Sequence, residues 1–225
     1  MKEFEENGLT IDGLDDIEQE NTAIDDIESE NVNLMMLGID GSGSMTGFTR
    51  DMIQSLEDFK DALVNSKDSN EILVARADFS DDVTIGGYKS INEFDTSFYT
   101  GGMTAMYDTI VQGSKKMLDY RKYLRDQGVR VKCVFAIFSD GMENGSSADV
   151  STTRRAVQNL NDEEITTAFI SFGPDAKVEA QNLGFKNLLE VGSTASELRK
   201  AFNCLSKSVI ESSKSVVADG DDFFV

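Results

Sequence analysis

From Val32 onward, short apolar runs typical of strands alternate with amphipathic segments typical of helices. The strand-like runs are VNLMMLGI, EILVARADF, VTIGGYKSI, RVKCVFAIF, ITTAFISFG and NLLEV, which begin at Val32, Glu71, Val83, Arg130, Ile165 and Asn187. Apolar residues at helical spacing separate them, over residues 52–63, 106–124, 154–160, 178–185 and 198–209. This alternation requires crossover connections. It therefore predicts an α/β fold with a doubly wound, mostly parallel central sheet and helices on both faces. The VTIGGYKSI run follows its predecessor closely enough to form one antiparallel edge strand.

Negative charge is concentrated ahead of this region. Residues 1–31 contain twelve acidic residues and one lysine, a net charge of −11 out of −20 for the whole chain. Two near-copies, LDDIEQEN from Leu14 and IDDIESEN from Ile24, lie there ten residues apart. Their few apolar side chains cannot form a core. We therefore expect residues 1–31 to be a disordered acidic arm, or one that carries a repeated docking motif. A domain over residues 32–212 and an acidic, aromatic tail over residues 213–225 complete the predicted organisation.

The chain contains no histidine and only two cysteines, Cys133 and Cys204. The lack of histidine excludes Ser-His-Asp and Cys-His catalytic groups, and zinc or iron sites with histidine ligands. A bound metal would therefore need oxygen ligands, which favours Mg²⁺, Mn²⁺ or Ca²⁺. We expect both cysteines to be small buried hydrophobic residues rather than the halves of a disulfide.

Several partners and locations are disfavoured by composition. No apolar run approaches the roughly 20 residues that cross a bilayer. The acidic start, MKEFEENG, lacks the basic and apolar regions of a signal peptide. No basic stripe is present for binding nucleic-acid phosphates. We therefore expect a cytoplasmic protein that binds neither membranes nor nucleic acid directly.

Side chains with oxygen atoms follow two of the predicted strands and precede one predicted helix. The sequences are DGSGS at residues 40–44, TGGMT at residues 100–104 and SDG at residues 139–141. In open α/β sheets, ligands bind outside the carboxyl ends of the strands. We therefore expect one group of oxygen ligands at that edge of the sheet: Asp40, Ser42, Ser44, Thr104 and Asp140.

Two carboxylates and three hydroxyls suit a hard divalent cation, which prefers oxygen ligands. They supply only two negative charges, so the ion would stay electrophilic and keep a position open for a partner's carboxylate. The alternative is that these small polar residues only cap helices and turns, in a domain that binds no ion.

Taken together, DGSGS, the TAMYD segment at Thr104–Asp108 and SDG resemble the metal-ion-dependent adhesion site of von Willebrand factor A domains. The separations are also similar to the family's, with 60 residues from Ser44 to Thr104 and 36 from Thr104 to Asp140. The resemblance covers roughly residues 32–212 and implies a Rossmann-like sheet flanked by helices. It also implies a role for each residue of the site.

By this resemblance, Asp40, Ser42 and Ser44 contact the metal, Thr104 does so directly or through water, and Asp140 lies in the same shell. Asp108 is expected to support the start of a helix rather than to bind the ion. The motif departs from the family in two places. Ser139 stands where threonine is commoner, and Met103 separates the glycines from Thr104. The second departure leaves Thr100 as an alternative ligand.

The resemblance implies a metal-dependent protein-binding module, not an enzyme. Its intracellular relatives serve as scaffolds, for example in AAA+ ATPase, chelatase-like and tellurite-resistance assemblies. A magnesium-dependent hydrolase of the phosphatase type is a second hypothesis. The sequence offers it no GxxxxGK[ST] phosphate loop and no arginine near the three loops. A third hypothesis is that the acidic tails supply a carboxylate to a neighbour's metal, giving self-assembly, or to their own, giving autoinhibition. The tails could also simply keep the protein soluble.

Overall fold

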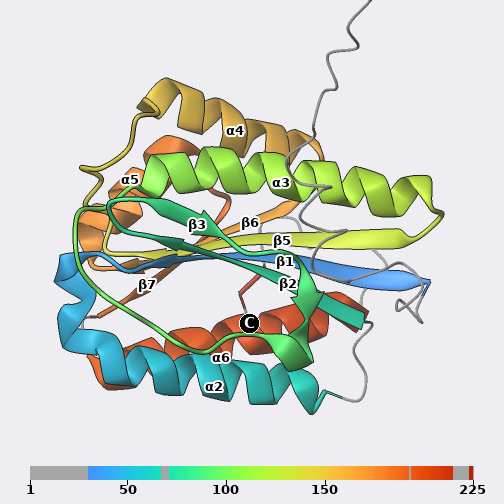
Figure 1. Cartoon of the computed structure of the whole chain (residues 1–225), viewed down its shortest axis with the longest axis horizontal. Coiled ribbons are helices and arrows are strands. Elements are labelled where there is room, and N and C mark those ends of the chain that lie inside the picture. Colours follow the sequence, from blue (N-terminus) through green and yellow to red (C-terminus); the bar gives the residue numbers. More distant parts are fainter. Residues whose placement is uncertain (1–29, 67–70, 193, 215–222, 225) are drawn as a thin grey trace, which may run out of the picture.

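A computed structural model describes residues 30–66, 71–192, 194–214 and 223–224, which form one sheet between two layers of helices (Figure 1). The strands are β1 (Asn31–Asp40), β2 (Glu71–Phe79), β3 (Val83–Ile85), β4 (Lys89–Ser90), β5 (Arg130–Ser139), β6 (Thr166–Phe172) and β7 (Asn187–Val191). The helices are α2 (Thr49–Val64), α3 (Met106–Asp126), α4 (Val150–Asp162), α5 (Pro174–Leu183) and α6 (Ala195–Lys214), with 3-10 turns η2 (Gly43–Phe48) and η3 (Ile91–Glu93). The predicted arm over residues 1–31 lies outside the described residues, except for Glu30 and Asn31.

The sheet has seven strands in the order β3-β2-β1-β5-β6-β7, and β4 also pairs with β2. The strands from β2 to β7 along this order are parallel, whereas β3 and β4 run antiparallel to β2. The predicted fold class is therefore confirmed. Where one antiparallel edge strand was expected, the structure has two short ones. The VTIGGYKSI run is interrupted after Ile85 by Gly86, whose N–H bonds to the Arg76 carbonyl.

Both faces of the sheet are buried, which explains the continuous apolar runs of its central strands. In β1, Leu34 and Met36 belong to the core under α3, α4 and α5, whereas Met35 and Leu37 belong to the core over α2 and α6. Figure 1 shows these two helical layers above and below the sheet. Successive side chains of a strand point to opposite faces, so one strand stabilises both layers.

The described residues of the predicted tail over residues 213–225 include part of a helix and one residue of the core. Helix α6 continues to Lys214, two residues beyond the predicted end of the domain at residue 212. The Phe223 side chain is only 2% exposed and belongs to the core over α2 and α6. Its backbone N–H donates a hydrogen bond to Asn187 Oδ1 at 3.0 Å. Of the residues assigned to this tail, Ser213 and Lys214 therefore belong to the last helix and Phe223 to the core.

Neither cysteine forms a disulfide, as predicted, and Cys133 is buried whereas Cys204 is partly buried. Burial in the apolar core raises the pKa of the Cys133 thiol to about 12. In the described part of the chain, no helix is long and apolar enough to cross a membrane.

Candidate metal centre

The first two predicted loops meet at the carboxyl edge of the sheet, the left-hand end in Figure 1. The Gly101 N–H donates to the Gly41 carbonyl at 2.8 Å, and the Gly43 N–H donates to the Gly102 carbonyl at 3.1 Å. Gly41 also donates to the carbonyl of Phe79, the last residue of β2. The loop after β1 is therefore held by backbone hydrogen bonds both to its neighbouring strand and to the second loop.

Gly41 is required at this junction by close packing. A Cβ atom at Gly41 would lie 2.9 Å from the Tyr99 carbonyl oxygen and 3.4 Å from that of Phe79. Glycine is needed here because two backbones approach each other closely at this position.

Asp40 is the last residue of β1, and its side chain is completely buried. Its Oδ1 accepts a hydrogen bond from the Ser42 N–H at 2.9 Å, and its Oδ2 accepts one from the Ser139 hydroxyl at 2.6 Å. Burial raises the pKa of the Asp40 carboxyl, and the nearby Asp140 charge raises it further, against the lowering effect of these hydrogen bonds. Within the described ranges, no cationic side chain offsets the ionised form of this buried carboxyl.

Ser42 and Ser44 bring two hydroxyls to the same place. Their Oγ atoms are 3.0 Å apart, at the start of η2, where Ser42 is buried and Ser44 is exposed. Because Ser42 also bonds to Asp40 through its backbone, the structure joins three of the five predicted ligands in one short segment.

Thr104, the ligand predicted from the second loop, is buried just before α3. Its N–H donates to Asn144 Oδ1 at 2.8 Å, and its carbonyl accepts from the N–H groups of Asn144 and Gly145. Among the described residues, no hydrogen bond joins the Thr104 hydroxyl to the other four predicted ligands. Thr100, the alternative ligand, lies with its hydroxyl 3.4 Å from that of Thr49 in α2.

Asp140 follows β5 and is partly exposed, with its Oδ1 accepting the Met142 N–H at 3.3 Å. The next residue, Gly141, has a φ of +81°, and a Cβ atom there would lie 2.3 Å from Ala176 Cα in α5. Only glycine tolerates both conditions. Ser139 completes this loop because its hydroxyl, besides donating to Asp40, accepts the Gly141 N–H at 2.9 Å.

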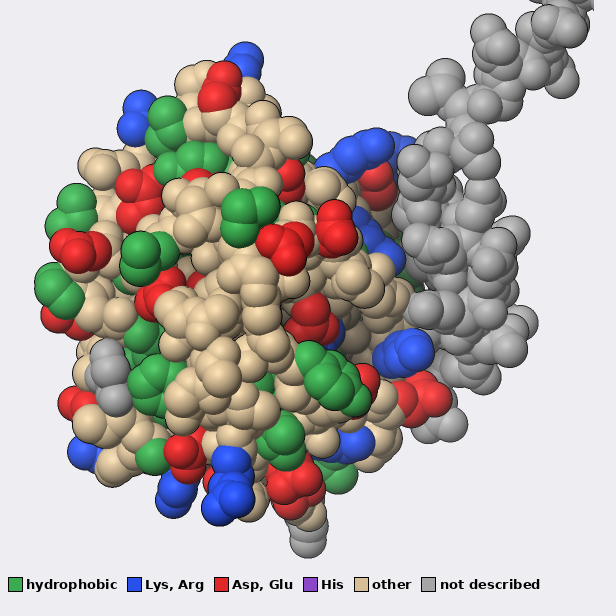
Figure 2. Space-filling view, turned by 60° about the vertical axis from the view of Figure 1, so that its left-hand side comes forward, with side chains coloured by type: hydrophobic (Ala, Val, Ile, Leu, Met, Phe, Trp, Pro, Cys, Tyr) green, Lys and Arg blue, Asp and Glu red, His purple; other side chains and the backbone are tan. Residues whose placement is uncertain are grey.

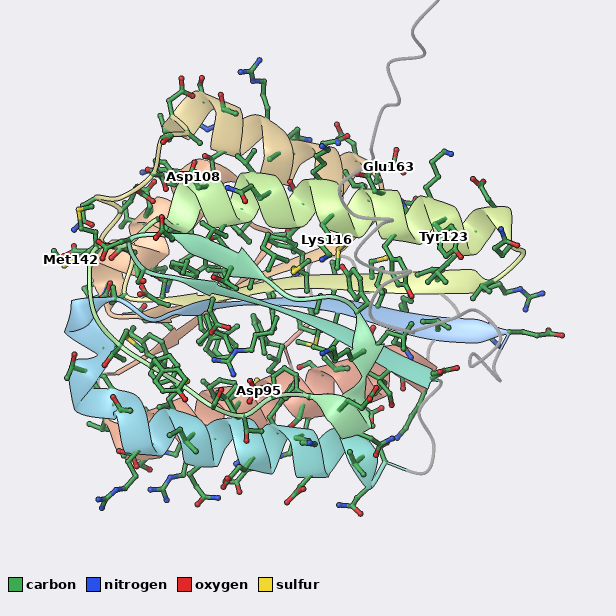
Figure 3. All side chains as sticks on the ribbon, in the orientation of Figure 1. Asp95, Asp108, Lys116, Tyr123, Met142 and Glu163 are labelled. Atoms are coloured by element: carbon green, nitrogen blue, oxygen red, sulfur yellow. The ribbon has the colours of Figure 1, made fainter. Side chains whose placement is uncertain are left out.

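Two carboxylates hold the loop between β5 and α4 in place through hydrogen bonds. Glu143 accepts hydrogen bonds from the Tyr107, Gly145 and Ser146 N–H groups. Asp108, at the start of α3, accepts the N–H groups of Ser147 and Ala148 at 2.8 Å each. Figure 3 shows Asp108 and Met142 at the same end of the molecule. Asp108 lies in the first turn of α3, as expected, and it also supports the segment before α4.

Sequence reasoning missed Asn144 and Glu143, and it noted Ser139 only as a departure from a motif. Asn144 accepts a hydrogen bond from the Thr104 N–H, 40 positions away, and Glu143 accepts one from the Tyr107 N–H, 36 positions away. Such pairing is a property of the fold and leaves no local pattern in the sequence.

The residues of this edge fit a hard divalent cation. The Asp40 carboxyl, the two neighbouring serine hydroxyls and the nearby Asp140 carboxylate are all oxygen ligands. Within the described ranges, no group of three or more His, Cys, Asp or Glu side chains could hold a metal. An ion here would therefore need the hydroxyls as ligands, as the sequence predicted.

A cleft of about 300 Å³ adjoins these residues. It is lined by Ser44 and Asp140 and by apolar side chains that include Met45, Phe48 and Phe172. Met142, with 62% of its surface accessible, also lines it, and the exposed Tyr99 and Met103 lie in the loop before α3, with 84% and 48% accessible. Figure 2, in which the left-hand side of Figure 1 comes forward, shows hydrophobic and acidic side chains interspersed on this face.

The sequence matches no protein-family model and no curated protein. The solved structures similar to it include the pilus adhesin SpaC from Lactobacillus rhamnosus GG in its open conformation, with a TM-score of 0.65 and 14% identity over 83% of this chain and 31% of that one. Proximal thread matrix protein 1 from the mussel byssus gives a TM-score of 0.60 and 18% identity over 80% of this chain and 46% of that one. A von Willebrand factor type A protein from Catenulispora acidiphila gives 0.56 and 16% identity over 80% of this chain and 43% of that one.

This chain therefore spans less than half the length of these three solved chains. At such low identities, the likeness concerns the fold. Combined with the strand order and the two helical layers, it shows that this chain has a fold of the von Willebrand factor A type.

Proposed function

We propose that this protein is a metal-dependent protein-binding module that helps to scaffold a complex inside the cell. A divalent cation, Mg²⁺ or alternatively Mn²⁺ or Ca²⁺, is held at the carboxyl edge of the sheet. Its ligands are Asp40, Ser42, Ser44, Thr104 and Asp140. When bound, the ion offers an open coordination position, which a carboxylate of a protein partner fills.

The observation that carries this proposal is the environment of Asp40. Asp40 is a completely buried carboxyl with no cationic side chain beside it among the described residues, and both its burial and the Asp140 charge disfavour ionisation. The Ser42 and Ser44 hydroxyls lie together at the end of the same strand. A divalent cation at this place would compensate both carboxylates, which accounts for a group that otherwise disfavours the folded state at neutral pH.

A binding role is favoured over the alternative of a hydrolase because two of the carboxylates beside the site already have structural roles. Asp108 and Glu143 each accept at least two backbone N–H groups and thereby hold loops in place. A general base needs a carboxylate that can accept a proton from substrate or water. Phosphatase turnover by the magnesium-loaded protein, lost in Asp40→Asn, would support the hydrolase instead.

The first test is a calorimetric titration of chelator-treated protein with MgCl₂ and MnCl₂. Wild type should show saturable binding of one ion per chain, and the isosteric Asp40→Asn and Asp140→Asn variants should show none. Asp126→Asn is the charge-matched control, because Asp126 is exposed at the far end of α3. Binding that survives in Asp40→Asn, or is equally lost in Asp126→Asn, would contradict the site.

A further inference from the structure

We propose that the carboxylate ligand of this site comes from a second copy of the same chain. The ligands are the two Asp-Asp-Ile-Glu segments at residues 15–18 and 25–28, here called the DDIE segments. This inference rests on the proposed metal-dependent function and names its partner. It follows from the apolar cleft beside the metal ligands, the spacing within the DDIE segments and the distance between the two ends of β1.

The cleft calls for a ligand that combines a carboxylate with an apolar side chain. Ser44 and Asp140 line both the candidate metal site and the cleft, while Met45, Phe48 and Phe172 give the cleft apolar walls. A ligand that only offered a carboxylate to the ion would leave these walls exposed to water, although their burial is favourable.

The DDIE segments have this combination at a suitable spacing. Asp15 and Ile17 are two residues apart, as are Asp25 and Ile27. In an extended chain, such residues point to the same side and lie about 7 Å apart. One segment can therefore direct a carboxylate to the ion and an isoleucine into the adjacent cleft.

The position of β1 shows that the second segment must act on another molecule. The described chain enters β1 at Asn31, and the metal ligands begin at Asp40, at the opposite end of the same strand. Nine residues of strand separate these ends by about 30 Å. From Asn31 back to Asp25, six residues reach at most about 22 Å even when fully extended. Asp25 therefore cannot reach the site of its own molecule.

This arrangement makes the contact head-to-tail. The surface that binds and the segment that is bound differ, so each copy can accept one neighbour and supply another. The first DDIE segment lies nearer the N-terminus than the second. When extended, the residues between it and Asn31 span about 50 Å, which gives this segment a longer reach toward a neighbouring molecule. Two segments ten residues apart would raise the effective concentration of ligand near one site.

The association must depend on the cation because both surfaces are acidic. Asp140 and the exposed Asp175 line the cleft, and the DDIE segments carry three acids each. Without a cation these charges repel one another. With the cation bound, the ligand carboxylate gains a direct partner, so chelation should dissociate the assembly fully.

Sedimentation velocity of the full chain, with MgCl₂ or MnCl₂ and then with EDTA, tests the proposal. We expect the average mass to rise with protein concentration in the presence of the metal and to return to the monomer in EDTA. Replacing both aspartate pairs, with Asp15→Asn, Asp16→Asn, Asp25→Asn and Asp26→Asn, should abolish the rise. Glu3→Gln, Glu5→Gln, Glu6→Gln and Glu20→Gln form the control, because the same number of charges is removed outside the segments.

A second variant tests the cleft. Ile17→Asn with Ile27→Asn keeps every carboxylate and all metal ligands, but removes the apolar side chains. We expect association to weaken about tenfold, the effect of losing one buried aliphatic side chain. Equal association of this variant and wild type would remove the cleft from the proposal.

The same samples are titrated with metal by calorimetry, so that two failures can be told apart. Metal binding without any metal-dependent association would overturn this inference and leave the proposed function standing, with a different protein as the ligand. The absence of metal binding would overturn the proposed function itself. Association that persists in EDTA would contradict both the metal-bridged contact and its head-to-tail geometry.

Discussion

Ile39 and Asp40 are consecutive residues of β1, and both side chains are completely buried. Ile39 lies in the core over α2 and α6, next to its strand partner Phe138 of β5. Asp40 lies at the carboxyl edge, where burial disfavours its charge and hydrogen bonds from Ser42 and Ser139 partly compensate it. The sheet interior and the sheet edge therefore bury their residues with opposite effects on stability.

This difference separates residues that stabilise the fold from residues that suit the binding of a ligand. The interior stabilises the fold by removing apolar surface from water. The edge keeps a buried carboxyl and exposed apolar side chains, which suit a ligand and do little for the isolated domain. Substitutions in the two regions should therefore respond differently to metal.

The largest change in stability is expected from a substitution in the sheet interior. Phe138→Ala removes a buried ring that stacks on Phe202 with centroids 4.2 Å apart. The free energy of unfolding should fall by about 3–5 kcal/mol. Denaturant unfolding should show the same loss with and without MgCl₂, if the variant remains folded enough to bind the ion. A loss of less than 1 kcal/mol would mean that the core repacks around the cavity.

Unlike Phe138→Ala, the substitution Asp40→Asn at the sheet edge should not lower the stability of the metal-free protein. The raised pKa of Asp40 means that its ionised form disfavours the folded state at neutral pH. In EDTA, the variant should therefore melt at or above the Tm of wild type. Acidification toward the ordinary carboxyl pKa of 3.8 should shift the difference in favour of wild type, because protonation removes the unfavourable charge.

In MgCl₂ at a hundredfold excess over its Kd, wild type should gain about 2.7 kcal/mol and the Asp40→Asn variant nothing. Thermal melts of both proteins, with and without the ion, measure these changes. A variant that is less stable than wild type in EDTA at pH 7 would break the comparison between edge and interior.

Asn144→Ala gives a smaller effect, confined to the edge. Asn144 positions Thr104 through its side chain and backbone, so the substitution should weaken metal affinity about tenfold. Asn144→Asp keeps the acceptor for the Thr104 N–H and should largely restore the affinity. Calorimetry checks both variants, and an unchanged affinity in Asn144→Ala would show that Thr104 does not depend on this contact.

The smallest effect is expected at the exposed Asp149, which lies outside both regions. Its side chain accepts the Thr152 N–H at the start of α4, and this hydrogen bond lowers its pKa to about 2. The stabilisation is therefore present above pH 4 and is lost as the pH falls through 2. Asp149→Ala should lower Tm slightly at pH 7 and by much less at pH 2. An equal decrease at both values would show that the charge is irrelevant.

The same division explains what could be predicted from sequence. The central strands β1 and β5 were predictable because burial on both faces leaves a continuous apolar run. The edge pair β3 and β4 was predicted as one strand, since two glycines within VTIGGYKSI did not reveal where pairing stops. Phe223 was assigned to a tail. It follows an acidic stretch and has only one aromatic neighbour, so no apolar periodicity in the sequence marked it as a core residue.

At the site, the position of these segments after predicted strands or before a predicted helix indicated that the DGSGS, TGGMT and SDG loops would share an edge. The structure places them there, and it links Asp40, Ser42 and Ser44 through short-range contacts. The binding of metal by these residues stays a prediction. The loop around Asn144 and Glu143 could not be predicted, because its hydrogen bonds join segments that only folding brings together.

The two ends of β1 also determine how the domain would carry a mechanical load. If a ligand is held at Asp40 while tension is applied through Asn31, the force runs along a strand paired on both sides with β2 and β5. Its parallel hydrogen bonds would then be loaded in shear and would have to break together, not one after another. Such a domain would resist being pulled apart along this axis far better than along one that peels β7 from the edge of the sheet.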